Sequence, residues 1–137
     1  MTPSAASRSC PTAATVGSAL GVTLPAPTSV AGASGNQLPA GAKAVVCNYH
    51  AQTYNVIIEL VTNLDPSDIS MFSSQFPVPY KSVAGVGDQA RSFLQPLSNG
   101  KDNEGVVATK GMVLVLIVAT ATPATLGQVE ALVTRLL

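Results

Sequence analysis

The segment Met112–Thr120 reads Met-Val-Leu-Val-Leu-Ile-Val-Ala-Thr and is apolar at every position before the final threonine. A strand with one wet face alternates apolar and polar side chains, and this run shows no alternation. We therefore predict an interior strand with a neighbour on each side and helices over one or both faces. The run has about half of the ~20 apolar residues that span a bilayer, and Lys110 and Pro123 bound it. It does not predict a membrane helix.

Two hairpins are expected around this run. Val106–Thr109 precedes it across a Lys-Gly turn, and an earlier pair, Lys43–His50 and Tyr54–Thr62, is separated by a short turn. One face of Tyr54–Thr62 is apolar, and the other is mixed and expected to be partly wet. The apolar face carries Val56, Ile58 and Leu60, and the mixed face carries Asn55, Ile57, Glu59 and Val61. A further strand is expected within Tyr80–Phe93, after a bend at two glycines. Pro96–Gly105 is rich in Ser, Asn, Asp and Gly and is expected to be a polar turn.

Three helices complete the pattern. Pro11–Leu20 has apolar residues at helical spacing and a glycine stop. Asp65–Asp68 reads Asp-Pro-Ser-Asp, a typical helix start, and two prolines end the helix that follows. Thr122-Pro123 opens an amphipathic C-terminal helix. The order predicts an α+β fold, in which an antiparallel sheet of about five strands is covered by N-terminal, middle and C-terminal helices.

Length and charge limit the classes of function. The 137 residues predict a flexible tether over residues 1–9 and a single domain over residues 10–137. Charged residues make up 10%, and seven basic residues balance seven acidic ones. A nucleic-acid-binding protein needs a basic field, and a polybasic membrane patch needs the same, so neither is expected. Residues 1–9 lack the basic and apolar regions of a signal peptide, so a signal would lie upstream.

The chain has two cysteines, Cys10 and Cys47. Cys10 comes just before the first helix, Cys47 lies within a predicted strand, and the long loop Val22–Gly41 lies between them. A disulfide would tie the helix to the sheet, close this loop and indicate an oxidising compartment. The protein would then be extracytoplasmic, either secreted or anchored through a removed upstream segment. The alternative is a cytosolic protein with two free thiols.

Residues with catalytic chemistry are few. His50 is the only histidine and has no Cys, His or Asp cluster near it in sequence, so we expect no metal and no cofactor. No serine lies in a Gly-x-Ser-x-Gly elbow. Gly85 and Gly87 lack the third glycine of a dinucleotide fingerprint and predict a turn. Asp88 is expected to cap that turn, and Arg91 to pair with an acid.

A ligand-binding surface is predicted between the helix Ser67–Gln75 and the segment Tyr80–Phe93. Its aromatic residues are Phe72, Phe76, Tyr80 and Phe93, and they lie near prolines and glycines. The alternative is that these residues complete the core.

Three motifs carry a resemblance to a known family. Cys10–Gly21 resembles the N-terminal helix of small actinobacterial, mycobacterial-type envelope lipoproteins, in which a cysteine opens a helix ending in Leu-Gly. Cys47-Asn48-Tyr49 resembles their second cysteine, and Gly85–Ala90 resembles their Gly-hydrophobic-Gly-Asp-x-Ala segment. Related folds also occur as extracellular sensor domains of bacterial kinases. The resemblance implies binding or sensing outside the membrane, without an assigned catalytic set.

These observations predict a non-enzymatic, extracytoplasmic binding or sensing domain of the cell envelope. Its expected partner is an apolar or envelope-derived ligand, or another protein. Two alternatives are a small hydrolase that uses His50 with a serine, and a structural envelope protein that assembles through an exposed sheet edge.

Overall fold

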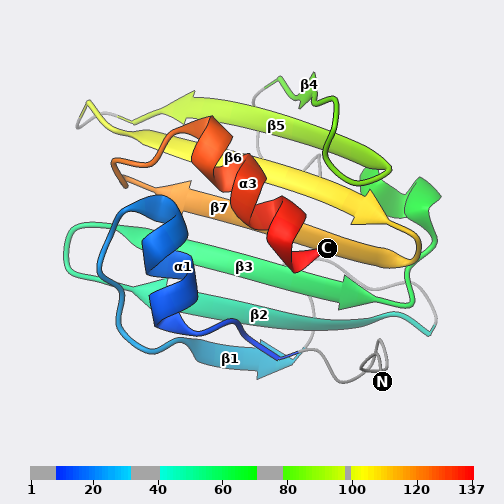
Figure 1. Cartoon of the computed structure of the whole chain (residues 1–137), viewed down its shortest axis with the longest axis horizontal. Coiled ribbons are helices and arrows are strands. Elements are labelled where there is room, and N and C mark those ends of the chain that lie inside the picture. Colours follow the sequence, from blue (N-terminus) through cyan, green and yellow to red (C-terminus); the bar gives the residue numbers. More distant parts are fainter. Residues whose placement is uncertain (1–8, 32–40, 71–78, 98–99) are drawn as a thin grey trace.

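The apolar run forms strand β7 (Val113–Thr120), which is the central strand of the sheet (Figure 1). The computed structural model describes residues 9–31, 41–70, 79–97 and 100–137. β7 pairs on one side with β3 (Asn55–Thr62) and on the other with β6 (Asp102–Lys110). Its side chains from Leu114 to Ala119 are all buried. The prediction that this strand is interior is confirmed.

The strands that the structure describes form one antiparallel sheet, in the order β1-β2-β3-β7-β6-β5-β4. The other strands are β1 (Thr28–Ala31), β2 (Lys43–His50), β4 (Lys81–Ser82) and β5 (Gln89–Pro96). The chain is therefore mostly antiparallel sheet with helices, as expected for an α+β protein, but the sheet has seven strands where the sequence predicts about five. Both predicted hairpins, β2–β3 and β6–β7, are present.

Two strand segments lie where the sequence predicts a loop or a turn. β1 falls within the predicted loop Val22–Gly41, and it is an edge strand that pairs with β2 alone. The first half of β6 falls within the predicted polar turn Pro96–Gly105, and it pairs with both β5 and β7. Pairing on two sides therefore overrides the low strand propensity of its Asp, Asn and Gly residues.

Gly105 has a packing role within β6. The ring of Phe93, its partner on β5, lies over this position, and a Cβ added to Gly105 would come within 1.8 Å of that ring. A side chain here would displace the aromatic ring from the core, so glycine is required by the close approach.

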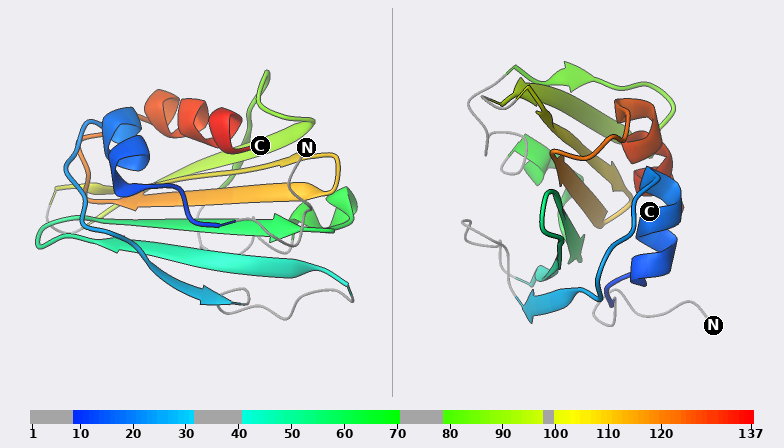
Figure 2. Two further views of the ribbon diagram at one scale, coloured as in Figure 1. Left: turned by 60° about the horizontal axis from the view of Figure 1, so that its bottom comes forward. Right: turned by 90° about the vertical axis from the view of Figure 1, so that its left-hand side faces the viewer.

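Helices α1 (Ala13–Leu20) and α3 (Leu126–Leu136) lie next to each other on one face of the sheet (Figure 2). The Thr12 hydroxyl accepts a hydrogen bond from the Thr15 N–H, and Thr125 forms a capping box with Gln128. Because these threonines are the caps, both helices begin a few residues later than the sequence predicts.

The middle helix is described only at its beginning, as the 3₁₀ turn η2 (Pro66–Asp68). The Asp65 carboxylate accepts a hydrogen bond from the Ser67 N–H at 3.0 Å, which lowers the pKa of Asp65. Asp65 is therefore the helix N-cap that the Asp-Pro-Ser-Asp sequence predicts. The rest of the predicted helix Ser67–Gln75 lies largely outside the described residues.

Two cores lie on the two faces of the sheet. The first packs under the helices and includes Val16, Tyr49, Ile58, Val115, Ile117, Val129 and Leu132. The second lies on the opposite face and includes Val61, Leu64, Ile69, Phe93, Val107, Leu114 and Leu116. The mixed face of β3 is partly wet only at Asn55 and Ile57, which are half-buried, because Val61 is fully buried and Glu59 is 2% exposed. Leu64 and Ile69 pack onto that same face and help to cover it.

A Cys10–Cys47 disulfide joins the segment before α1 to β2, with the two Cα atoms 5.7 Å apart. Nearby, the Tyr49 hydroxyl donates a hydrogen bond to the Pro11 carbonyl at 2.5 Å, and burial raises the pKa of Tyr49 to about 12. A disulfide is compatible with an extracytoplasmic protein. Within the described residues, no helix is both long and apolar enough to cross a membrane.

Candidate functional site

The aromatic residues of the predicted ligand surface that the structure describes lie at the second core. Phe93 is 2% exposed, and its ring centre is 5.0 Å from that of Tyr80, with the planes tilted by 55°. Phe72 and Phe76 lie outside the described residues. The ring of Phe93 therefore packs in the core, as the alternative interpretation proposes, and a ligand-binding role for this group of residues stays a prediction.

An apolar hollow of about 340 Å³ lies beside this group, at the β4–β5 edge of the sheet. Its lining consists of Pro79, Lys81, Ser92, Phe93, Leu94 and Leu126. Leu94 is 48% exposed, which is unusual for a large apolar side chain. Because Phe93 and Leu94 are neighbours in a strand, their side chains point to opposite faces. Leu94, and not the ring of Phe93, is thus the open apolar group of this hollow.

The hollow forms where the outermost strand stops. β4 pairs with β5 only through Lys81 with Ser92 and Ser82 with Arg91. Pro79 comes two residues before β4 and has no N–H to donate to a strand partner. α3 begins at Leu126, whose side chain packs partly against the first core. The short edge strand and the start of the helix leave the concave space between them.

A buried carboxyl group lies one strand inward from the hollow. Glu104 on β6 pairs with Leu94 on one side and with Ala119 on the other, so its side chain shares the helix-bearing face with Leu94. It is 7% exposed, and no described group hydrogen-bonds its Oε2 atom. Burial, followed by the charge of Asp102, raises the pKa of Glu104 above its ordinary value. Glu104 falls within the predicted polar turn Pro96–Gly105, so its burial was not predicted.

We expect Glu104→Gln to raise the free energy of unfolding at pH 7 by about 1 kcal/mol, because the amide cannot ionise in the buried site. Since the folded-state pKa is raised, the penalty of Glu104 is absent below the unfolded pKa and grows as pH rises through the folded value. The gain should therefore vanish below pH 4.5, the ordinary glutamate value. Urea unfolding at a series of pH values measures it.

Glu130→Gln on α3 is the matched control, since Glu130 is only half-buried. It should show no gain of this size. A Glu104→Gln variant that is less stable than the parent at pH 7 would contradict the prediction, because the carboxylate would then have a stabilising partner.

The contacts of His50 and of the Gly85–Gly87 turn indicate structural roles for these residues. His50 is exposed at the end of β2, with its Nδ1 atom 3.2 Å from the Asn55 Oδ1 atom. Gly87 has a positive φ of 56°, and a Cβ there would come within 2.4 Å of the Thr109 carbonyl oxygen. The Asp88 carboxylate accepts a hydrogen bond from the Gly111 N–H at 2.8 Å, so it caps the β6–β7 turn and not its own. Among the described residues, no group of three or more His, Cys, Asp or Glu side chains could hold a metal ion.

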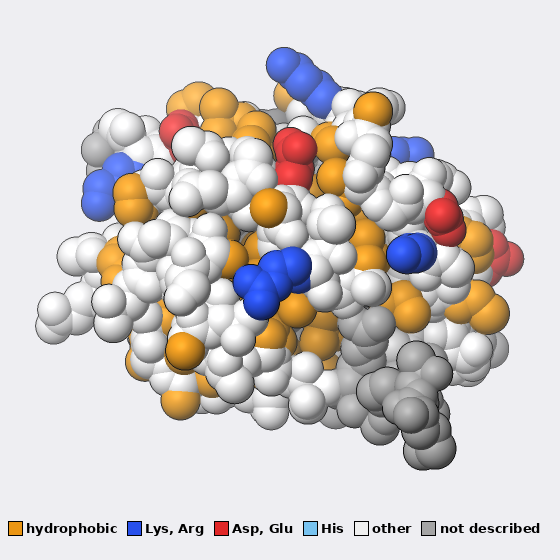
Figure 3. All heavy atoms as spheres, viewed as in Figure 1, with side chains coloured by type: hydrophobic (Ala, Val, Ile, Leu, Met, Phe, Trp, Pro, Cys, Tyr) orange, Lys and Arg blue, Asp and Glu red, His pale blue; other side chains and the backbone are white. Residues whose placement is uncertain are grey.

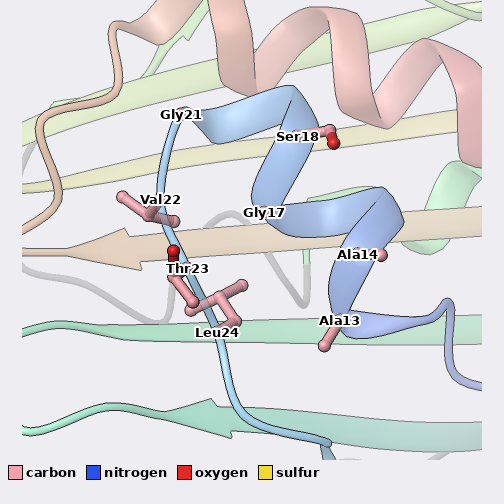
Figure 4. Close-up of a pocket in the computed structure, with 8 residues that line it drawn as sticks. All are labelled: Ala13, Ala14, Gly17, Ser18, Gly21, Val22, Thr23 and Leu24. Carbon is pink, nitrogen blue, oxygen red and sulfur yellow. The ribbon is translucent and has the colours of Figure 1, made fainter.

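A second hollow, of about 490 Å³, lies between α1 and the segment Gly21–Leu24 that follows it (Figure 4). The segment approaches the helix closely at Gly17, where a Cβ would come within 2.4 Å of the Val22 carbonyl oxygen. The lining side chains are small and include Ala14 and Ser18. This hollow is open to solvent, and none of the described residues that line it has a buried polar atom without a partner, so its lining does not indicate a ligand.

Charged groups do not gather on the helix-bearing face. Figure 3 shows the lysine, arginine and acidic side chains scattered singly over it. This distribution is consistent with the balanced composition of the chain. Comparison of the chain with protein-family models, with curated proteins and with solved structures found no match.

Proposed function

We propose that this chain is an extracytoplasmic, non-enzymatic binding or sensing domain that takes an apolar ligand in the hollow at the β4–β5 edge. The observation that carries the proposal is the half-exposed Leu94 within a concave, mainly apolar site. Leu94 and Met112 are the large apolar side chains that are exposed among the described residues, and Leu94 is the one in a hollow. Apolar groups exposed in a concavity mark binding sites more often than isolated ones do.

The proposed location rests on the disulfide and on the resemblance. The Cys10–Cys47 bridge is stable in oxidising compartments outside the cytoplasm. The motifs Cys10–Gly21 and Gly85–Ala90 resemble those of small actinobacterial envelope lipoproteins, and we propose a relationship to that family. Such a domain would meet lipids and other envelope components, which fits an apolar site.

The lining indicates the shape and polarity of the ligand. A volume of about 340 Å³ is at the small end of ligand sites, so one acyl chain or a similar group would fill it. Leu94 and Leu126 would contact the chain. Lys81 and Ser92 belong to the same lining, and the ammonium group of the exposed Lys81 would suit a polar or acidic head group. A single-chain amphiphile is therefore the proposed ligand class.

We expect Leu94→Ser to raise the Kd for a fluorescent fatty acid, dansyl-undecanoic acid, by about tenfold. Leu94 would bury most of its exposed half against the chain, and the lost burial corresponds to about 1–1.5 kcal/mol. Because Leu94 is already half-exposed, the fold should tolerate the change. Fluorescence titration of the purified protein measures the Kd.

Met112→Ser is the matched control, since Met112 is 53% exposed and lies outside the lining of the hollow. It should bind the probe as the parent does. Equal weakening by both substitutions, or no binding by the parent, would overturn the proposal.

The two alternative functions give different results. A hydrolase would show turnover of ester, peptide or glycoside substrates that His50→Ala abolishes, although the described partner of His50 is the amide of Asn55 and not a carboxylate. A structural protein assembling through a sheet edge would form concentration-dependent oligomers without ligand. Both described edge strands are short, and one carries Lys81, which is how sheet proteins avoid such pairing.

A further inference from the structure

Five polar side chains form a continuous row across the sheet on the face opposite the helices. The row runs over His50 on β2, Asn55 on β3, Thr120 on β7, Asn103 on β6 and Gln95 on β5. Each member pairs directly with the next: His50 with Asn55, Asn55 with Thr120, Thr120 with Asn103, and Asn103 with Gln95. We call these five residues the polar row.

Strand alternation sets the face on which the polar row lies. Thr120 is two residues after Val118, and Gln95 is two residues after Phe93. Val118 and Phe93 belong to the second core, and side chains two apart in a strand point to the same side. The polar row therefore continues the face of the second core to the end of the sheet that lies on the left in Figure 1. The hollow at Leu94 opens from the other face.

The row is accessible and internally ordered. His50 is exposed, and the other four members are half-buried. His50 contacts Asn55 through Nδ1 and Oδ1 at 3.2 Å, and the Asn103 Nδ2 donates to the Gln95 Oε1 at 3.1 Å. These hydrogen bonds hold the side chains at both ends of the row in place. The row contains no Asp, Glu, Lys or Arg.

Two amide oxygens at the row have unused hydrogen-bonding capacity. The Oδ1 atoms of Asn103 and of Asn48 are buried and accept no hydrogen bond from any described group. Asn48 lies one row inward on β2, where it pairs with Ile57. A buried acceptor without a donor costs about 1–3 kcal/mol, and because both oxygens are closed to solvent here, a ligand hydroxyl would reach one only after the amide group rotates. Ile57, the cross-strand partner of Asn48, presents a half-buried apolar surface.

We propose that the polar row binds a neutral polyhydroxylated ligand, an oligosaccharide chain laid across the strands. Hydroxyl groups donate and accept, as the amides and the Thr120 hydroxyl do. Neighbouring strands are about 4.8 Å apart, comparable with the length of one sugar ring, so five strands offer a track of about 19 Å. The apolar face of a sugar ring could rest on Ile57. The lack of charged side chains in the row disfavours phosphate-bearing ligands, which need Arg or Lys.

A protein partner fits this surface less well. Protein interfaces depend on buried aromatic or arginine anchors, and the polar row has neither. An extended peptide would add to a sheet edge through its backbone, whereas this row crosses the middle of the sheet. The oligosaccharide proposal does not depend on the apolar hollow, which lies on the opposite face.

The test is an NMR titration with short neutral gluco-, manno-, galacto- and arabino-oligosaccharides. We expect at least one to shift the side-chain amide signals of Asn55, Asn103 and Gln95, with saturation. Shifts confined to the helix-bearing face, or no shifts with any of the four, would overturn the proposal. Shifts that follow protein concentration without sugar would also overturn it, because a second copy would then occupy the row.

Gln95 and Gln89 give a matched pair of variants. Both are glutamines on β5 with the same side-chain direction, and Gln89 is exposed at the far end of the strand, outside the row. We expect Gln95→Ala to raise the Kd of the bound oligosaccharide about three- to tenfold and Gln89→Ala to leave it unchanged. Asn55→Ala should act as Gln95→Ala does. Equal effects of Gln95→Ala and Gln89→Ala would show that binding is elsewhere.

Discussion

Replacing Val115 with aspartate is expected to unfold the domain. Val115 is fully buried in the central strand, between Leu60 on β3 and Ala108 on β6, and it faces the core under the helices. The change removes an apolar side chain whose burial contributes about 2 kcal/mol, and it adds a carboxylate with no partner. An uncompensated buried charge costs about 3–5 kcal/mol. Together these losses approach the whole stability of a typical domain.

Circular dichroism and urea unfolding of the purified variant measure the effect. Met112→Asp is the control, because it places the same charge just before β7 at a position that is 53% exposed. It should change the free energy of unfolding by less than about 0.5 kcal/mol. A Val115→Asp protein with a native spectrum and a cooperative transition would show that the site is wetter than the structure indicates.

The centre of the sheet could be predicted because its signals are local. β7 shows its burial on both faces through the absence of alternation. The β2–β3 and β6–β7 hairpins follow from short turns between strand patterns, so the partners of each strand are neighbours in sequence. The predicted bounds of β2, Lys43–His50, agree with the structure.

The first half of β6 could not be predicted, because its strand conformation depends on remote partners. Residues Asp102–Gly105 have the composition of a turn, and only pairing with β5 and β7 makes them a strand. Because of this error, the burial of Glu104 was not predicted either. A glutamate in a turn is expected to be solvated, whereas a glutamate facing the core beneath a helix layer is desolvated.

The candidate sites depend on register between strands that are distant in sequence. The short turn makes the pairing of His50 with Asn55 predictable, but nothing local aligns either residue with Gln95. The predicted aromatic surface was near the apolar hollow, but strand alternation turns the ring of Phe93 into the core and leaves Leu94 open. Which apolar side chain is open to solvent therefore depends on strand alternation, whereas the ligand-binding role of the aromatic residues stays a prediction.

Removing the Cys10–Cys47 disulfide is expected to lower the free energy of unfolding by about 4 kcal/mol. The bridge spans 37 positions of sequence, and the chain-entropy model gives about this value for a closed loop of that length. α1 has eight residues, too few for a helix to be stable alone, so it relies on its anchorage and packing. Hydrogen exchange should therefore accelerate more in Ala13–Leu20 than in β3 and β7 when the bridge is lost.

The measurement compares the oxidised protein, the reduced protein and a Cys10→Ala/Cys47→Ala variant in urea unfolding. Tyr49→Phe is the control. It removes only the hydrogen bond from the Tyr49 hydroxyl to the Pro11 carbonyl, which also joins β2 to the segment before α1. It should cost about 1 kcal/mol, well below the cost of losing the bridge. Two titratable thiols in protein purified under oxidising conditions would show that the bridge does not form. A loss below about 1 kcal/mol on reduction would show that α1 is held in place without the bridge, because its packing against α3 would then be sufficient.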